Sequence, residues 1–298
     1  MLSPADDAVH QEKRIGGRLA AAAVFVAAVI AGSVVDRATA TTPVAPTVLA
    51  GDFHIHGMPG DGALPVWEIQ REAVRRGLDV IAITNHNDNL SYRIAQASGL
   101  LKPYPIVIPG QELTTSRFHI AAIGVRTMVS ATLSAHEAIT AIHAQGGIAI
   151  AAHPSPRSWR EDDEAALRML DGSEVSHPIV IGRPHRGAEL LEFFQRARTL
   201  NPDIAPIAST DFHLGTPLGL CRTYLIVDDV SEAGVLDAIR RGRTVATGPG
   251  DRLIGDDEHV KAVRAHLKPP QPANFGRGTS TWLALVALLS LGLLVLLD

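Results

Sequence analysis

The middle of this chain predicts an α/β fold with parallel strands, and three observations favour that class. Apolar runs of strand length alternate with stretches of helical periodicity, the order expected when each strand is followed by a helix. Side chains of metal-binding type recur where those runs end. At 298 residues, 46% of them hydrophobic, the chain is long enough for one large barrel.

Short apolar runs mark five expected strands, at residues 78–84, 105–108, 148–152, 204–208 and 223–227. Between these strands, capping residues and glycines mark where helices are expected to begin and end. Ser134 with Glu137 three residues later forms a capping box, and Gly146 ends that helix. Residues 65–76 and 231–241 carry apolar side chains at helical spacing, and a glycine follows each. Strand and helix therefore alternate through this region.

Apolar segments at both ends predict association with a membrane. Residues 19–35 are uncharged and follow a basic segment, and seventeen helical residues span about 25 Å. An A-x-A signal at 38–40 leaves two readings open, a removable signal peptide and a retained anchor. Residues 281–297 are leucine-rich, uncharged and without a polar face, so they predict a C-terminal transmembrane helix.

The expected domain organisation follows from these segments. Residues 1–18 are a cytoplasmic basic segment, 19–40 a signal peptide or anchor, 41–50 a linker, 51–250 the globular domain, 251–280 a second linker and 281–297 the transmembrane helix. The chain is thus expected to be membrane-anchored, with its globular domain on the extracytoplasmic side, periplasmic or extracellular.

Charge and cysteine content limit the chemistry. The net charge of -4 is small for this length and does not predict a nucleic-acid surface. Nucleic acid could still be a substrate, because active-site metals bind phosphate themselves, but an aromatic content of 4% gives no support for a base-stacking groove. The single cysteine, Cys221, excludes an intramolecular disulfide and thiolate zinc sites. Nitrogen and oxygen must hold any metal.

Metal-binding residue types lie at or just beyond the C-terminal ends of the apolar runs. They are His54, His56, His86, Glu112, His153, Asp211 and His213. In a parallel barrel or sheet those ends gather on one face, where such folds build their sites. Residues far apart in the sequence are therefore expected to converge on one pocket.

The ligand types indicate hydrolytic chemistry. His54 and His56 are separated by one residue, so in an extended segment their side chains share a face. Imidazole and carboxylate together suit Zn²⁺, Mn²⁺ or Fe and not a calcium site built from oxygen alone. Glu112 and Asp211 are the expected catalytic carboxylates, because each can bridge two metals. Two metals about 4 Å apart activate a bridging water and stabilise both oxygens of a displacement.

Five motifs resemble those of the PHP (polymerase and histidinol phosphatase) superfamily. They are FHIH at 53–56 with DG at 61–62, AITNH at 82–86, GQE at 110–112, AHP at 152–154 and STDFH at 209–213. The stretch at 236–244, followed by Gly248 and Pro249, looks most like the carbaryl-hydrolase-like branch. The resemblance covers residues 51–250 and implies a distorted (β/α)7 TIM-like barrel with a site for two or three metals.

The resemblance also implies the ligand sets. His54, His56, Glu112 and Asp211 would hold one metal, Glu112, His119 and His153 a second, and Asp61, His86 and His213 a third. His119 opens an apolar run instead of closing one. Asn85 stands where the family usually has Asp, and an amide supplies no charge, so occupancy of the third site is left open.

Further polar residues have two readings each. Arg157, just past the AHP motif, could bind a substrate phosphate through two guanidinium nitrogens, or be a surface arginine at the start of a helix. His177 and His185 lie in an expected loop, which could be a substrate-binding lid or a solvated basic loop.

The sequence predicts a metal-dependent phosphoesterase in which a metal-bridging hydroxide attacks phosphorus in a small-molecule substrate. No residue is identified as the general acid. Two alternatives stay open: a carboxylic or carbamic ester hydrolase that uses the same site, and a non-catalytic metal- or ligand-sensing domain displayed on the membrane. The sequence makes no prediction of oligomeric state.

Overall fold

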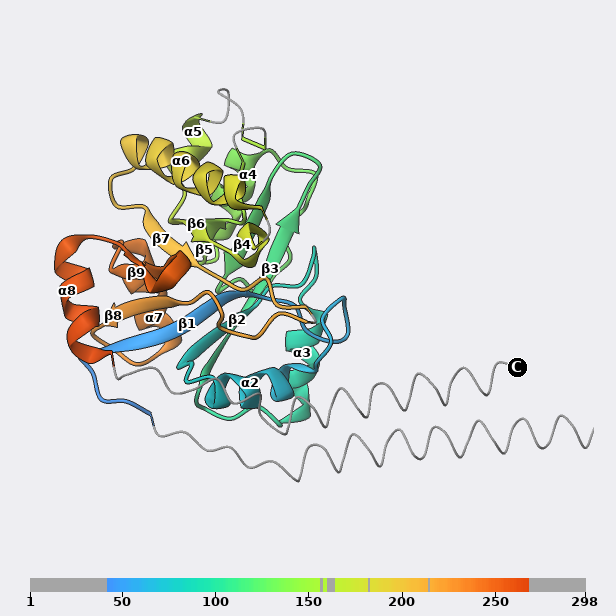
Figure 1. The fold of residues 1–298 in the computed structure, drawn as a ribbon. Coiled ribbons are helices and arrows are strands. Elements are labelled where there is room, and N and C mark those ends of the chain that lie inside the picture. Colours follow the sequence, from blue (N-terminus) through green and yellow to red (C-terminus); the bar gives the residue numbers. More distant parts are fainter. Residues whose placement is uncertain (1–41, 156–157, 160–163, 182, 214, 268–298) are drawn as a thin grey trace, which may run out of the picture. The chain divides into compact units, whose positions relative to one another are not determined.

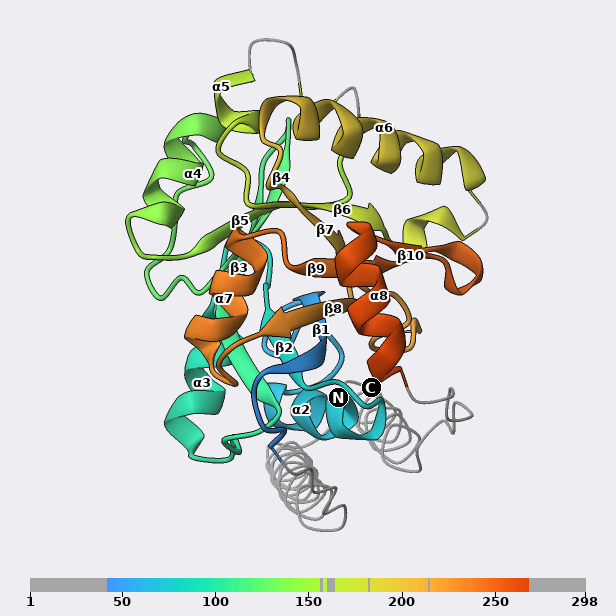
Figure 2. The same cartoon turned by 90° about the vertical axis from the view of Figure 1, so that its left-hand side faces the viewer.

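The protein contains one mixed sheet of ten strands (Figure 1). The computed structural model describes residues 42–267 apart from 156–157, 160–163, 182 and 214. The strands are β1 (Thr47–Ile55), β2 (Val80–Ile83), β3 (Ile106–Thr114), β4 (His119–Ile123), β5 (Ile148–Ala151), β6 (Gly172–Ser176), β7 (Ala205–Ala208), β8 (Thr223–Val227), β9 (Thr244–Thr247) and β10 (Leu253–Ile254). Their order is β10-β9-β8-β1-β2-β3-β4-β5-β6-β7. The sheet curls until β7 returns beside β8 and β9, which nearly closes a barrel (Figure 2).

Threonine hydroxyls join the two sides of this closure. Thr223 Oγ1 donates to the Ala208 carbonyl at 3.0 Å and accepts from the Ala208 amide at 2.8 Å. Thr244 Oγ1 donates to the Pro206 carbonyl at 3.0 Å. Both threonines are fully buried. Their side chains therefore satisfy backbone groups of β7 that a further strand would otherwise pair.

The predicted (β/α)7 barrel is wrong, because the sheet is mixed. Of the nine strand pairs in the described residues, five are antiparallel: β1 with β8, β3 with β4, β4 with β5, β8 with β9, and β9 with β10. The other four are parallel. The link between β3 and β4 is too short for the helical crossover that a parallel pair requires, so these strands form a hairpin.

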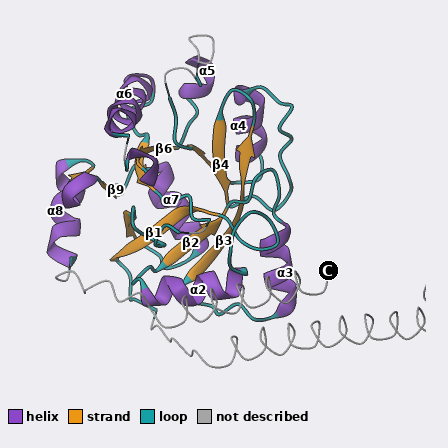
Figure 3. Ribbon diagram, turned by 45° about the vertical axis from the view of Figure 1, so that its right-hand side comes forward, coloured by secondary structure: helices purple, strands orange, loops and turns teal. Residues whose placement is uncertain are grey.

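The helices lie mainly outside the strands (Figure 3). They are α2 (Val66–Arg75), α3 (Leu90–Ser98), α4 (Ala135–His143), α5 (Glu164–Leu167), α6 (Pro184–Leu200), α7 (Glu232–Arg240) and α8 (Asp257–His266), with short 3-10 turns η2 (Pro178–Val180) and η3 (Pro249–Asp251). The predicted capping box of α4 is confirmed: the Ser134 side chain accepts from the Glu137 amide, and the Glu137 carboxylate accepts from the Ser134 amide.

Helix α7 packs against one end of the barrel interior. Val235, Leu236 and Ile239 join a buried cluster with Leu49 at the start of β1 and Ile148 at the start of β5. Gly124 makes room for this packing, since a Cβ there would lie 2.7 Å from Leu236 Cδ1. A second cluster fills the layer between the sheet and α4, α5 and α6. Polar side chains occupy the opposite end of the barrel, where the parallel strands end.

Within the described residues, no helix has the length and apolarity needed to cross a membrane. The predicted C-terminal transmembrane helix at 281–297 and the N-terminal segment at 19–40 lie outside those residues. The membrane part of the predicted fold class is therefore not supported by the structure.

Candidate metal centre

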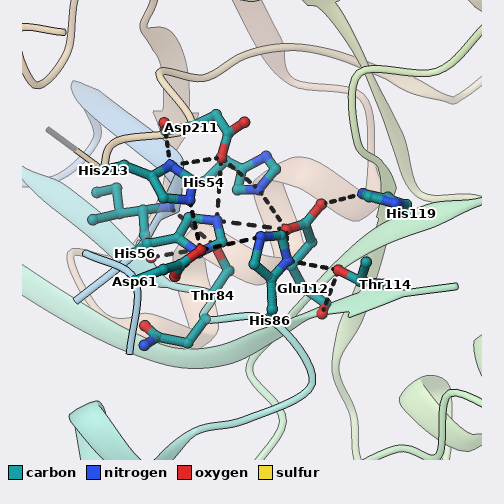
Figure 4. A network of polar contacts seen from close by, with 12 residues as sticks. His54, His56, Asp61, Thr84, His86, Glu112, Thr114, His119, Asp211 and His213 are labelled. Atoms are coloured by element: carbon teal, nitrogen blue, oxygen red, sulfur yellow. Dashed lines mark hydrogen bonds and ion pairs between the residues drawn. The ribbon is translucent and has the colours of Figure 1, made fainter. Parts of the chain in front are cut away.

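Predicted ligands from distant strands meet in one network of polar contacts (Figure 4), at the end of the barrel where the parallel strands finish. His54 lies near the end of β1, Glu112 near the end of β3, and His153 just after β5. His119 begins β4, yet it lies at the same end, because β4 runs antiparallel and pairs His119 with Thr114 at the end of β3. The mixed sheet thus explains the one predicted ligand that opens a strand instead of closing it.

Four buried donor atoms face one another in the first predicted ligand set. The Nε2 atom of His54 lies 3.4 Å from Glu112 Oε2 and 3.3 Å from Asp211 Oδ1. The Nε2 atom of His56 lies 3.5 Å and 3.1 Å from the same two oxygens. All four atoms are buried, and none makes a hydrogen bond of regular geometry with the described residues, although His86 Nδ1 lies 2.6 Å from Glu112 Oε2. Unpaired buried polar atoms are rare, so this arrangement fits a bound cation.

The other ring nitrogen of each histidine faces a carboxylate. His54 Nδ1 lies 3.0 Å from Glu174 Oε1, and His56 Nδ1 lies 3.0 Å from Asp61 Oδ1. A carboxylate accepts a hydrogen bond, so each contact favours the proton on Nδ1 and a lone pair on Nε2. The two lone pairs then point at Glu112 and Asp211. Metal-binding histidines are commonly oriented by carboxylates in this way.

Glu112 links the first ligand set to the second. Its Oε2 faces His54 and His56, while its Oε1 lies 2.7 Å from His119 Nδ1 and 3.2 Å from His153 Nε2. The donor atoms of Glu112, His119 and His153 all lie within 4.8 Å of one another. One carboxylate therefore presents an oxygen to each set, the geometry of a bridging ligand.

The third predicted set is more open to solvent. Asp61 Oδ2 lies 2.9 Å from His213 Nε2 and 3.3 Å from His86 Nε2. The side chains of Asp61 and His86 are 44% and 41% exposed, whereas those of His54, His56 and Glu112 are fully buried. His86 Nδ1 also lies 2.7 Å from Thr114 Oγ1, which fixes the ring against β3. The site therefore runs from a buried centre to an exposed mouth.

The carboxylates of the centre are held in the ionised form. Burial alone raises the pKa of Glu112, but the charge of His54 and hydrogen bonds from His119 and His153 outweigh it and hold the pKa far below the usual range. The pKa of Asp211 is lowered in the same way, with burial opposed by His54 and by contacts to His177 and His56. Burial lowers the pKa of His54, yet Asp211 and Glu112 raise it overall. The centre therefore stabilises positive charge.

Two of the predicted ligands have left-handed backbone conformations. His153 has φ 28° and Asp211 has φ 49°, a region that residues other than glycine seldom adopt. Both neighbouring peptide groups of His153 are fixed, since its amide donates to Glu174 Oε2 at 2.6 Å and its carbonyl accepts from Arg186 at 3.0 Å. Such strain costs about 1–3 kcal/mol and is typical of functional sites.

Two residues of the centre are not among the predicted ligands: Glu174 lies within β6, and His177 directly follows this strand. Glu174 is fully buried and contacts His54 and His153. His177 is also buried, so the reading of its segment as a solvated loop is wrong for this side chain, while the lid reading stays a prediction. His185 is exposed and lies in α6. The segment GSEVS contains one apolar residue, which gave no sign of a strand. Arg157 lies outside the described residues.

Asn85 forms hydrogen bonds with the loop that follows β1. Its side-chain amide donates to the carbonyls of Gly57 at 2.7 Å and Pro59 at 3.1 Å, and its oxygen accepts from the Gly57 amide at 2.9 Å. Ser91 Oγ adds a fourth bond at 3.1 Å. Asn85 thus holds the loop that leads from β1 to Asp61, a role for which an amide supplies both the donor and the acceptor.

No family model matches the chain. A curated relative, the "Uncharacterized protein MJ1587" of Methanocaldococcus jannaschii, is 34% identical over 141 residues, which cover 43% of this chain and 81% of the relative.

Two solved structures share the fold. One is a two-domain protein of Bacteroides vulgatus ATCC 8482 described as containing a predicted PHP-like metal-dependent phosphoesterase, with a TM-score of 0.57, 21% identity, and coverage of 76% of this chain and 73% of that one. The other is PsfC of Pseudomonas syringae PB-5123, with a TM-score of 0.50, 15% identity, and coverage of 74% and 96%. The carbaryl-hydrolase-like branch is not supported by these comparisons and stays a prediction.

Proposed function

The chain belongs to the family of the uncharacterized protein MJ1587 of Methanocaldococcus jannaschii, and from its candidate centre we propose that it is a metal-dependent phosphoesterase. One observation carries the proposal: His54 Nε2, His56 Nε2, Glu112 Oε2 and Asp211 Oδ1 are buried, without hydrogen bonds of regular geometry to the described residues, and 3.1–3.5 Å apart across the histidine–carboxylate pairs. The fold shared with a protein described as PHP-like supports the same reading.

The donor set fits divalent transition metals. It combines imidazole nitrogens with carboxylates held ionised, which suits Zn²⁺, Mn²⁺ or Fe²⁺. When bound, such ions supply an activated water and neutralise charge on a phosphoryl group. Glu112 holds the buried sets together through its two oxygens, and Asp211 completes the first set.

The remaining residues orient the ligands and face the substrate. Glu174 and Asp61 fix the rings of His54 and His56. The half-exposed side chains of Asp61, His86 and His213 line the mouth, where a substrate oxygen arriving from solvent would first meet the site. A small phosphoester is the proposed substrate, because phosphoester oxygens are natural partners of a multi-metal site.

The test is hydrolysis by the full chain after chelation and reconstitution with Zn²⁺, Mn²⁺ or Fe²⁺. The substrates would be p-nitrophenyl phosphate, bis(p-nitrophenyl) phosphate, p-nitrophenyl acetate and 1-naphthyl N-methylcarbamate. We expect metal-dependent release from a phosphate ester, a loss of at least about 100-fold in Glu112→Gln, and full activity in His136→Ala, whose side chain is exposed on α4. Hydrolysis of only the carboxylic or carbamic ester would assign the chain to that class instead. Metal binding without any turnover would favour a sensing domain.

A further inference from the structure

The segment after β6 places a further histidine, besides His54 and His56, against Asp211 of the proposed metal centre. His177 follows Ser176, the last residue of β6, and begins the 3-10 turn η2. Its Nε2 atom is buried and lies 3.3 Å from Asp211 Oδ2, the oxygen that does not face His54 and His56. It makes no hydrogen bond of regular geometry with the described residues.

The position of the proton on His177 is set by the backbone. Its Nδ1 atom accepts a hydrogen bond from the Ile179 amide at 3.0 Å. A backbone N–H can only donate, so Nδ1 must carry the lone pair, and the proton of this ring sits on Nε2. His177 therefore presents an N–H group, and not a lone pair, to the metal centre.

This tautomer decides whether His177 can be a metal ligand or a hydrogen-bond donor. Nitrogen atoms of His54, His153 and His177 lie within 4.8 Å of one another, close enough to bind one cation together. A metal would need the lone pair of Nε2, however, and the Ile179 contact places a proton there. The tautomer of His177 is thus the opposite of the one that the carboxylate contacts favour for His54 and His56.

We propose that His177 is a positioning residue that donates its Nε2–H to Asp211 Oδ2 and so keeps Asp211 Oδ1 directed at the first metal position. The proposal rests on the proposed metal centre, which it deepens. Asp211 needs such support because its backbone is in the left-handed region and its side chain is partly exposed. Glu174 supports His54 from the same strand, so β6 supplies no predicted ligand but orients two of them.

Two substitutions distinguish the role of the Nδ1 atom of His177 from that of its Nε2 atom. In His177→Asn the side-chain oxygen replaces Nδ1 and can still accept from the Ile179 amide, which preserves the turn but removes the donor to Asp211. In His177→Gln the amide nitrogen reaches about the place of Nε2 and retains that donor. The readouts are Zn²⁺ affinity of the full chain, by competition with a chelator, and the protonation of His177 by ¹⁵N-imidazole NMR.

We expect Zn²⁺ affinity to fall about 10–100-fold in His177→Asn and to stay within about threefold in His177→Gln. The NMR spectrum should show the Nε2–H form of His177 with and without Zn²⁺, and ¹¹³Cd-loaded protein should show no cadmium coupling to this ring. Equal affinity in wild type and His177→Asn, equal loss in both variants, an Nδ1–H ring, or a cadmium coupling would each overturn the role of His177. A wild-type chain that binds none of Zn²⁺, Mn²⁺ and Fe²⁺ would instead overturn the proposed function itself.

Discussion

Glu174 Oε1 and His54 Nδ1 lie 3.0 Å apart, and both side chains are fully buried at the centre of the site. The other oxygen of Glu174 accepts from the His153 amide at 2.6 Å. One carboxylate thus orients a ligand of the first set and the backbone of a ligand of the second. Burial raises the pKa of Glu174, but the nearby His54 and His177 outweigh it and keep the pKa low.

Glu174→Gln is expected to weaken metal binding and lower stability. An amide has one oxygen where the carboxylate has two, so its NH2 group would face either the Nδ1–H of His54 or the amide of His153, and two donors would oppose each other. We expect Zn²⁺ affinity to fall about 10–100-fold and the free energy of unfolding to drop by about 1–3 kcal/mol. Chelator competition and urea unfolding measure the two effects. Unchanged affinity would show that Glu174 does not orient His54.

Asn85→Asp is expected to damage the third ligand set instead of improving it. A carboxylate would face the carbonyls of Gly57 and Pro59 with no proton to donate, in a buried position. We expect a loss of about 2–3 kcal/mol in the free energy of unfolding and a selective loss of the weakest-bound metal. Ser91→Ala removes only one bond to Asn85 and should cost less. A gain in stability or in bound metal for Asn85→Asp would contradict this account of the loop.

Cys221 is expected to react slowly with alkylating reagents in the native protein. Burial raises the pKa of its thiol to about 11, and the thiolate is the reactive form, so alkylation at pH 8 should be on the order of 100-fold slower than for an ordinary thiol. Because Cys221 is the only cysteine in the chain, the iodoacetamide labelling rate reports this side chain alone. Urea-unfolded protein is the control and should react at the ordinary rate. Rapid labelling of the folded chain would disprove the raised pKa.

The stability contributed by Asp79 is expected to decrease as the pH rises. Burial raises the pKa of Asp79 despite hydrogen bonds from the Ala50 amide and the Tyr104 hydroxyl. A raised carboxyl pKa favours the folded state below the unfolded value of 3.8, and that benefit is lost as the pH passes the folded pKa. Asp79→Asn should therefore be more stable relative to wild type at pH 7 than at pH 4. Parallel curves of unfolding free energy against pH would refute this.

The convergence of the site was predictable from the sequence, because strand-end positions share a face whatever lies between them. His54, Glu112, His153 and Asp211 come together from distant segments as expected. Whether they bind metal stays a prediction. The capping box of α4 was also predictable, because it depends only on Ser134 and Glu137, three residues apart.

The mixed sheet was not predictable in the same way. An apolar run indicates a strand but not the direction of its neighbour, so the antiparallel hairpin of β3 and β4 looked like part of a parallel barrel. Glu174 was missed and His177 was assigned to a loop, because a single acidic residue between serines resembles a loop and the partner of Glu174 lies 120 residues away in the chain. Only the folded barrel shows that these two residues face the centre.

The metal content of the full chain, with His56→Ala beside His136→Ala, tests the central claim most directly. His56 Nε2 is one of the four buried unpaired atoms, whereas His136 is exposed on α4 outside the centre. Elemental analysis after reconstitution should find more than one equivalent of Zn, Mn or Fe in wild type and His136→Ala, and clearly less in His56→Ala. No bound metal in wild type, or equal content in all three proteins, would contradict the metal centre.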